Sequence, residues 1–298
     1  VFKAPQTPKG LFFQFGKYRV TDNVNPSDPV ETADLAPKKR SGRILAVANQ
    51  KGGVGKTTTA INLSTALAAV GRRVILFDLD PQGNASTGVG VDRNAAEIGS
   101  YEVLIDGASI KDAIVETEVP NLSLVPASID LSGAELELVE IERREFRLRK
   151  AFEEFSDKYD YVLIDCPPAL GLLTLNALVA SDGVLVPLQC EYLALEGLSQ
   201  LVRTVERVGE AFNPGLGIQG IVLTMYDARN NLSNLVADDV RSYFGDVVYS
   251  TQIPRNVRVS EAPSHGKPVL LYDFQCSGAQ AYVHLAGEVL RREEGALS

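Results

Sequence analysis

A turn at residues 51–59 has the composition of a phosphate-binding loop. It holds three glycines, two lysines and three threonines within nine residues, in the order Lys-Gly-Gly-Val-Gly-Lys-Thr-Thr-Thr. The usual P-loop pattern begins with a glycine five residues before the Gly-Lys pair. Gln50 stands at that position, so the pattern fails at its first residue. The residues that remain are still sufficient to bind the phosphates of a nucleotide.

Each residue type in this turn has a defined role in such a site. Glycines let backbone N–H groups converge on phosphate oxygens, and the N-terminus of the helix that follows favours anions. Lys56 can reach the β- and γ-phosphates, and Thr57 can hold Mg²⁺. The predicted nucleotide-binding set is Lys51, Gly52, Gly53, Val54, Gly55, Lys56, Thr57 and Thr58.

Two carboxylates, Asp78 and Asp80, follow a second apolar run. A carboxylate at the end of a parallel strand lies beside the crevice where ligands bind. We expect Asp80 to orient the attacking water, and Asp78 to support the loop or to hold Mg²⁺ through water. The alternative is structural, with these side chains capping a helix or forming an Asx turn before Gly83.

Asp165 ends another apolar run, within the sequence Leu-Ile-Asp-Cys-Pro-Pro. An acid in this place is typical of a Walker B arrangement, which supports Mg²⁺ and its waters. An aspartate after a strand is weak evidence by itself, since many are caps, but the P-loop upstream favours the metal. Pro167 and Pro168 stiffen the next loop, which suits a sensor of the γ-phosphate. The predicted metal-binding set is Thr57, Asp78 and Asp165.

Short apolar strands and helices alternate along the chain and position these residues. Strands are predicted at residues 43–49, 74–77, 122–125, 161–164, 184–187 and 218–223. Helices are predicted at residues 57–70, 131–155, 193–212, 232–244 and 279–290. Continuous apolar strands, each followed by a helix, indicate an α/β fold with a mostly parallel central sheet and helices on both faces.

Composition and charge restrict the class of protein. Hydrophobic residues make up 45% of the 298 residues and charged residues 22%, as in a globular protein with a full core. Residues 1–43 contain five prolines, and eight basic against four acidic residues give them a charge of +4 within a total of −9. We predict a flexible tail or linker at 1–43 and one domain at 44–298, with a basic tail that binds nucleic acid or a partner as the alternative.

The sequence favours a cytoplasmic protein without a membrane partner. Its three cysteines form no CxxC pair, which indicates reduced thiols, and two histidines make a His-rich metal site improbable. No stretch approaches the roughly 18 consecutive apolar residues of a membrane span. Residues 287–294 carry both charge signs and no bulky aromatic face, unlike a membrane-binding amphipathic helix.

The loop KGGVGKTTT resembles the deviant Walker A motif of the ParA/MinD group of ATPases, which includes the nitrogenase iron protein. The resemblance implies ATP-dependent formation of a sandwich dimer, in which Lys51 reaches the phosphates bound by the other subunit. It also implies that Asp80 is the hydrolytic acid. The segment around Asp165 matches the group's DxPP motif, with Cys166 at the variable position. Lys51, Lys56 and Asp80 are thus the catalytic candidates.

Three polar loops, at residues 224–229, 253–258 and 260–267, resemble those of the Soj/ParA chromosome-partitioning branch, and the resemblance covers roughly residues 43–292. The resemblance implies that Pro254 and Asn256 lie by the adenine, and that Arg229 and Arg258 contact DNA without reading its sequence. The neighbouring cations Arg255 and Lys267 are further DNA-binding candidates. Acidic and basic residues balance across 226–270, so a monomer should bind DNA weakly and a dimer more strongly.

The function predicted from these features is that of an ATP-dependent DNA-segregation switch at the nucleoid. ATP drives dimerisation and non-specific binding of double-stranded DNA, and a ParB-type centromere-binding partner stimulates slow hydrolysis. A MinD-like membrane-positioning ATPase is the alternative. An iron–sulfur protein would need two suitably placed cysteines per subunit, and a tyrosine kinase of similar fold would need a C-terminal tyrosine cluster; neither is found.

Overall fold

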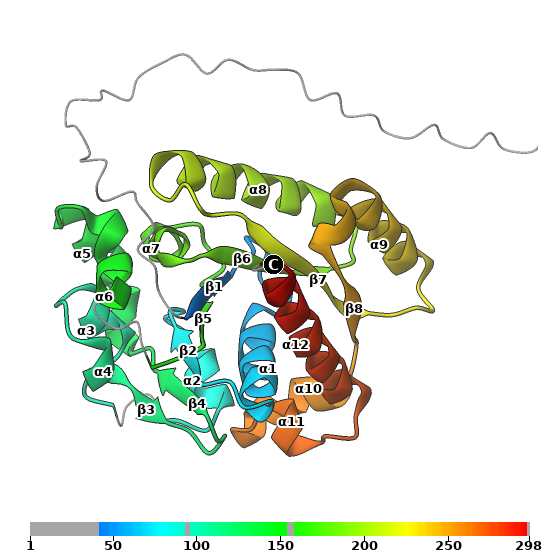
Figure 1. Cartoon of the computed structure of the whole chain (residues 1–298), viewed down its shortest axis with the longest axis horizontal. Helices are drawn as coiled ribbons and strands as arrows, with labels where there is room; N and C mark the ends of the chain where they lie inside the picture. The colour runs from blue at the N-terminus through cyan, green and yellow to red at the C-terminus, as the bar shows by residue number, and fades with distance from the viewer. Residues whose placement is uncertain (1–41, 93–95, 154–157, 297–298) are drawn as a thin grey trace, which may run out of the picture. The chain divides into compact units, whose positions relative to one another are not determined.

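The computed structural model describes residues 42–92, 96–153 and 158–296 (Figure 1). The strands are β1 (Arg43–Val47), β2 (Val74–Asp78), β3 (Val115–Glu116), β4 (Leu122–Val125), β5 (Tyr161–Asp165), β6 (Gly183–Gln189), β7 (Ile218–Tyr226) and β8 (Val248–Pro254). They form one eight-stranded sheet in the order β3-β4-β2-β5-β1-β6-β7-β8. Every neighbouring pair is parallel except β3 with β4.

Helices connect these strands. They are α1 (Lys56–Ala69), α2 (Asn84–Gly88), α3 (Ser100–Leu104), α4 (Ile110–Ala113), α5 (Ala134–Glu140), α6 (Arg147–Glu153), α7 (Leu172–Ala180), α8 (Ala194–Ala211), α9 (Asn231–Phe244), α10 (Val257–Glu261), α11 (Val269–Tyr272) and α12 (Ser277–Ala296). Short 3₁₀ helices are η2 (Ile129–Ser132), η3 (Arg144–Phe146), η4 (Gly245–Val247) and η5 (Ala262–His265).

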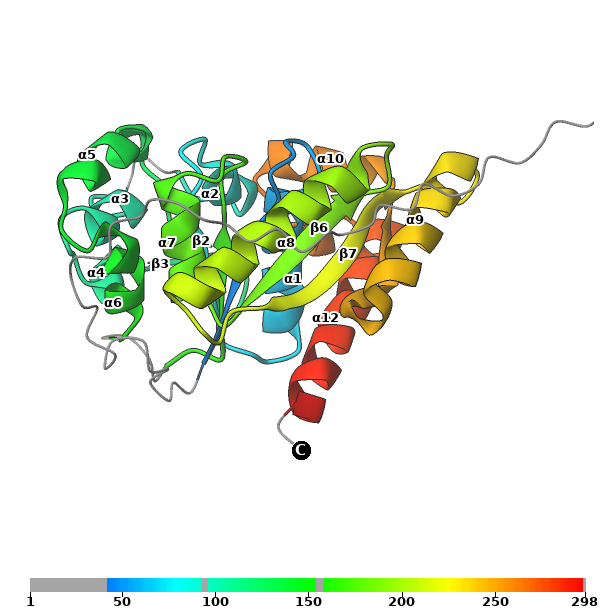
Figure 2. The ribbon, with the colours of Figure 1, turned by 90° about the horizontal axis from the view of Figure 1, so that it is seen from above.

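Two hydrophobic clusters lie on opposite faces of the sheet. Successive side chains of a strand point to opposite faces, so Ile44 and Ala46 of β1 join one cluster while Leu45 and Val47 join the other. Helices α7 and α8 cover the first face, and α1 and α12 cover the second (Figures 1 and 2). This burial on both faces explains why the central strands are continuous apolar runs.

The predicted α/β architecture is confirmed. All six predicted strands form, and four of the predicted helices correspond to α1, α8, α9 and α12. Strand β8 was not predicted, because its sequence Val-Tyr-Ser-Thr-Gln-Ile-Pro mixes polar residues into a strand at the edge of the sheet. Strand β3 has only two residues, too few for a sequence pattern.

The prediction of one long helix over residues 131–155 is wrong. Helix α5 ends at Glu140 because Ile141 is extended, with φ −89° and ψ 128°. Arg143 then adopts a left-handed φ of 54°, and α6 starts in a new direction. The guanidinium of Arg147 donates to the carbonyl oxygens of Leu104 and Ile105, at 2.9 and 2.7 Å. Tertiary contacts of this kind outweigh the helix propensity of a charged, amphipathic sequence.

The predicted tail at residues 1–43 lies almost wholly outside the described residues and stays a prediction. Within the described ranges, none of the helices has both the length and the apolar character needed to span a membrane.

Candidate nucleotide-binding site

The predicted site residues meet where three central strands end. In the order β2-β5-β1, Asp78 is paired in register with Asp165, and Asp165 with Val47. The backbone N–H of Leu79 also donates to the carbonyl oxygen of Asp165 at 3.0 Å. The carboxyl ends of neighbouring parallel strands therefore bring both aspartates to the start of the P-loop, as expected for this kind of fold.

The P-loop is shaped for anion binding. Gly53 and Gly55 have φ values of 74° and 87°, which residues other than glycine rarely adopt. No side chain caps the N-terminus of α1, so its first N–H groups can bind a ligand's oxygens. The hydroxyl of Thr224, at the end of β7, donates to the carbonyl oxygen of Val54 at 2.8 Å and holds the loop from the side.

Lys56 is buried below the loop, with 6% of its surface exposed. Its ammonium donates to the carbonyl oxygen of Lys51 at 3.2 Å. Burial lowers the pKa of Lys56, while the nearby Asp165, Cys166 and Asp80 act to raise it. A buried cation without a directly bound carboxylate is suited to bind a phosphate of the ligand.

Asp165 is fully buried, and among the residues that the structure describes neither of its carboxylate oxygens has a hydrogen-bonding partner. Burial raises its pKa well above the ordinary value, and the charge of Asp78 adds to the effect. The Thr57 hydroxyl is near enough to oppose this rise, although it makes no hydrogen bond of normal geometry. An unpartnered buried carboxylate beside a hydroxyl is a donor set that fits Mg²⁺.

Asp78 organises the loop that follows β2. One of its oxygens accepts hydrogen bonds from the Ser86 N–H and hydroxyl at 2.8 and 2.7 Å, and the other accepts from the Asp80 N–H at 3.3 Å. Burial raises the pKa of Asp78 to about 6, against the effect of the Ser86 hydrogen bonds. The sequence predicts that Asp78 either supports the loop or holds Mg²⁺ through water. These hydrogen bonds favour support of the loop, and the water-mediated role toward Mg²⁺ remains a prediction.

Asp80 takes part in the Asx turn that the sequence left open as the alternative. Its Oδ1 accepts from the Gln82 N–H at 3.0 Å, and its carbonyl oxygen accepts from the Gly83 N–H at 2.8 Å. The carboxylate is 7% exposed and close enough to Lys56 to influence its pKa. The turn thus fixes Asp80 at the edge of the P-loop, where it could also orient water.

Lys51 lies at the surface and forms an ion pair with Glu191 of the same subunit. The Lys51 N–H also donates to Asn49 Oδ1 at 3.0 Å, while the Asn49 amide donates to the carbonyl oxygen of Pro187 at 2.8 Å. Asn49, Glu191 and the role of Thr224 are not predicted from the sequence. Asn49 and Glu191 each lie two residues beyond the end of a strand, as Asp80 does, and Thr224 lies within β7, two residues before the strand ends.

The candidates from the C-terminal loops lie farther along the sheet. Pro254 ends β8 and is in register with Tyr226 of β7. Asn256 caps α10 by accepting from the Arg258 N–H at 2.8 Å, and it donates to the Ser277 hydroxyl at 3.0 Å. The Arg255 N–H donates to the carbonyl oxygen of Tyr226 at 3.0 Å. This bond joins the loop of Arg255 to the end of β7 that precedes Arg229.

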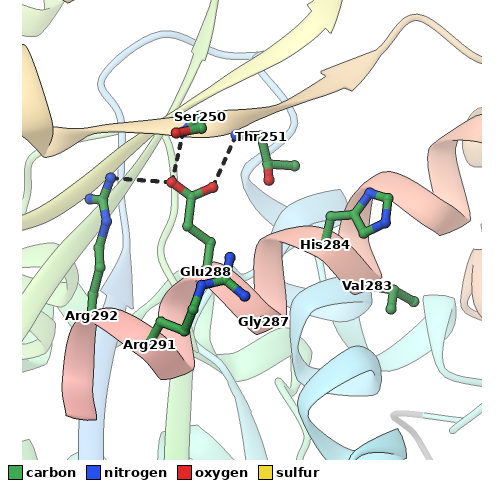
Figure 3. A pocket seen from close by; sticks show the side chains of 8 residues that line it. All are labelled: Ser250, Thr251, Val283, His284, Gly287, Glu288, Arg291 and Arg292. Carbon is green, nitrogen blue, oxygen red and sulfur yellow. Dashed lines mark hydrogen bonds and ion pairs between the residues drawn. The ribbon is translucent and has the colours of Figure 1, made fainter. Parts of the chain in front are cut away.

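Two further features supply no ligand to this site. Cys166 and Cys190 are buried free thiols, and burial raises both pKa values, that of Cys190 to about 11. A cavity of about 720 Å³ lies between β8 and α12 (Figure 3). There Glu288 accepts from the N–H groups of Ser250 and Thr251, at 2.7 and 3.0 Å, and pairs with Arg292 at 3.4 Å. These bonds anchor α12 to the edge strand.

Known proteins resemble this chain over most of its length. A family profile described as an AAA domain matches residues 42–218. The chromosome partitioning protein ParA of Caulobacter vibrioides (strain NA1000 / CB15N) is 62% identical over 253 residues, which cover 84% of this chain and 95% of that protein. The sporulation initiation inhibitor protein Soj of Bacillus subtilis (strain 168) is 56% identical over 248 residues, covering 83% and 98%. Cobyrinic acid a,c-diamide synthase from Mycobacterium smegmatis, solved with an ATP analogue and magnesium, is 40% identical with a TM-score of 0.75, covering 86% of this chain and 97% of that one.

Proposed function

The chain belongs to the ParA/Soj family of chromosome partitioning proteins, and from this premise we propose that it is a DNA partitioning ATPase driven by ATP. ATP binding produces a sandwich dimer that binds double-stranded DNA without sequence preference. A ParB-type centromere-binding partner then stimulates slow hydrolysis, which releases the DNA. The protein would act in the cytoplasm, at the nucleoid.

One observation carries the ATPase proposal: an uncapped helix N-terminus, a buried lysine and an unpartnered buried carboxylate lie at the same edge of the sheet. The N–H groups of the P-loop and Lys56 would bind the phosphates. Thr57 and Asp165 would hold Mg²⁺, which when bound neutralises charge on the phosphate oxygens. The solved synthase with its ATP analogue and magnesium supports this ligand pair, although its name points to a different overall reaction.

Hydrolysis would depend on positioning and electrostatics, because phosphoryl transfer needs no protein nucleophile. Asp80, fixed by its turn, would orient the attacking water. Lys51 would leave Glu191 and approach the phosphates bound by the second subunit, where a cation stabilises the developing charge. Pro254 and Asn256 would border the adenine, and Arg229, Arg255, Arg258 and Lys267 would contact DNA phosphates.

The test is the mass in solution by light scattering with ATP and Mg²⁺, using Asp80→Ala to block turnover. Wild type with ADP and Lys51→Ala with ATP are the controls. We expect a dimer only for Asp80→Ala with ATP. A monomer in every sample would contradict the sandwich dimer, and a dimer in every sample would show that assembly does not depend on the nucleotide.

DNA binding is tested separately, by mobility shift with ATP, ADP and no nucleotide. We expect a shift with ATP only, and equal binding in all three samples would refute the switch. For the MinD-like alternative, pelleting with anionic liposomes and ATP is the discriminating assay. The apolar side of α12 already packs against α1 and the sheet, with Ala279, Tyr282, Leu285, Ala286 and Val289 buried, so we expect the protein to stay in the supernatant.

A further inference from the structure

We propose that acidic side chains of the chain itself hold the DNA-binding arginines, so that a DNA phosphate must compete with a carboxylate for each guanidinium. Asp227 holds Arg229, and Glu261 together with Asp273 holds Arg258. This inference rests on the proposed function, because it concerns the control of the same DNA contact.

Asp227 binds one edge of the Arg229 guanidinium through both of its carboxylate oxygens. The Nε and Nη2 of Arg229 donate to Oδ1 and Oδ2 of Asp227, each at 2.9 Å, and the backbone N–H of Arg229 donates to Oδ1 at 3.1 Å. The hydrogen bonds from Arg229 lower the pKa of Asp227 to about 2. Asp227 therefore presents a full negative charge to the arginine at neutral pH. The bidentate carboxylate occupies the Nε edge of the guanidinium and offsets the positive charge that would attract a DNA phosphate.

Arg258 is held by two carboxylates from different segments. Its Nη1 lies 3.1 Å from Oε2 of Glu261, at the end of α10, and its Nε lies 3.4 Å from Oδ2 of Asp273, just after α11. The Tyr272 hydroxyl donates to the same oxygen of Glu261 at 3.4 Å. The fold thus holds Glu261 in place, and the two carboxylates more than offset the charge of Arg258.

The other two cations of the DNA set differ. Within the described ranges, neither Arg255 nor Lys267 forms an ion pair, and Arg255 is near enough to act on the pKa of Asp227. Arg255 and Lys267 can therefore contact a DNA phosphate directly, whereas phosphate must compete with carboxylates for Arg229 and Arg258. A monomer would bind DNA weakly through the first two residues. A dimer supplies enough phosphate contacts for DNA to compete with the carboxylates as well.

The expected effect follows from exposure. The Arg229 side chain is 90% exposed and that of Asp227 28% exposed, so water screens the pair. Ion pairs of this kind alter affinity by about five-fold at most. Removing Asp227 should tighten DNA binding by about two- to five-fold for each subunit, and by the square of that factor when both subunits of a dimer contact one duplex.

The experiment measures DNA affinity by fluorescence anisotropy of a labelled duplex, using the full chain with an ATP analogue and Mg²⁺. Asp227→Asn is compared with wild type, and again in the Arg229→Ala background. Asp238→Asn is the matched control, because this acid is also exposed, lies nearby on α9 and has no ion pair within the described ranges. We expect Asp227→Asn to tighten binding in the first background and to have no effect in the second.

A gain in DNA affinity of the same size in both backgrounds would overturn the proposal, because it would reflect only the loss of repulsion between the Asp227 carboxylate and the DNA. Weaker binding by Asp227→Asn would also overturn it, by showing that Asp227 orients Arg229 for DNA. The double variant Glu261→Gln/Asp273→Asn gives the second test, and its gain should vanish in Arg258→Ala. No binding by wild type with any nucleotide would refute the proposed function itself, whereas binding that neither acidic variant alters would refute this inference alone.

Discussion

Replacing Asp165 by asparagine should stabilise the nucleotide-free protein while it abolishes the response to Mg²⁺. The carboxylate is fully buried, neither oxygen has a partner in the described part of the chain, and burial together with Asp78 raises its pKa. Asparagine keeps the shape of the side chain and removes the charge. The fold should therefore gain stability at the position where the proposed function loses a metal ligand.

The magnitude follows from the charge. Leaving a buried polar group unsatisfied costs about 1–3 kcal/mol, and more for a charged group. The asparagine amide is also left without partners, so the gain is only the excess cost of the charged over the neutral group. Lys56 offsets part of this cost, because it acts to lower the pKa of Asp165. We expect a gain of about 2 kcal/mol, which corresponds to a rise in Tm of about 4–8 °C for a domain of this size.

Thermal melting at pH 8 with a fixed concentration of ADP is the assay, in EDTA or in excess Mg²⁺. Mg²⁺ at about 100 times its Kd should add about 2.7 kcal/mol to wild type and nothing to Asp165→Asn. Asp160→Asn is the control, because Asp160 accepts from the Arg73 N–H at 2.7 Å and pairs with its guanidinium at 3.2 Å. That variant should lose stability. A lower Tm for Asp165→Asn in EDTA, or an Mg²⁺ response equal to that of wild type, would refute the reasoning.

Three further predictions concern the same edge of the sheet. Glu191→Gln should release Lys51, so that ATP-dependent dimerisation occurs at protein concentrations up to about five-fold lower in light scattering. Glu196→Gln is the control because Glu196 is exposed, and weaker dimerisation of Glu191→Gln would contradict the prediction. Thr224→Val removes the hydrogen bond to Val54 and should weaken ATP binding by about 0.5–1.5 kcal/mol in calorimetry, whereas Thr224→Ser should retain it. The metal-free protein should lose stability as the pH rises from about 4 through 6, because the pKa of Asp78 is about 6 in the folded state against 3.8 in the unfolded state. Over this range the folded state binds the proton of Asp78 more tightly, so deprotonation favours unfolding. A free energy of denaturant unfolding that does not change with pH over this range would contradict the prediction.

The sequence predicts the fold and the phosphate end of the site because both depend on local patterns. A glycine-rich turn between strand and helix defines the P-loop, and an acid directly after an apolar strand identifies Asp78 and Asp165. Glu191 and Thr224 could not be assigned in this way, because their contacts with Lys51 and Val54 depend on where β6 and β7 lie in the sheet. The break between α5 and α6 was missed for the same reason, since Arg147 bonds to carbonyl oxygens more than forty residues away.

Stability and function oppose each other at the ends of β2 and β5. Asp78 and Asp165 are both buried, burial raises the pKa of each, and the charge of Asp78 raises that of Asp165 further, so the charged forms destabilise the fold without ligands. Asp78 offsets its share of this destabilisation through Ser86, which gives the loop of Asp80 its shape. Within the described ranges Asp165 has no such partner, and a purely structural aspartate in that place would be expected to acquire one. Thr57 and Lys56 oppose the rise in its pKa only in part. A cation that binds from outside would offset the rest, and it would stand beside the phosphate-binding loop. The cost in stability is therefore itself an argument that the edge of the sheet is built for a metal-bound nucleotide.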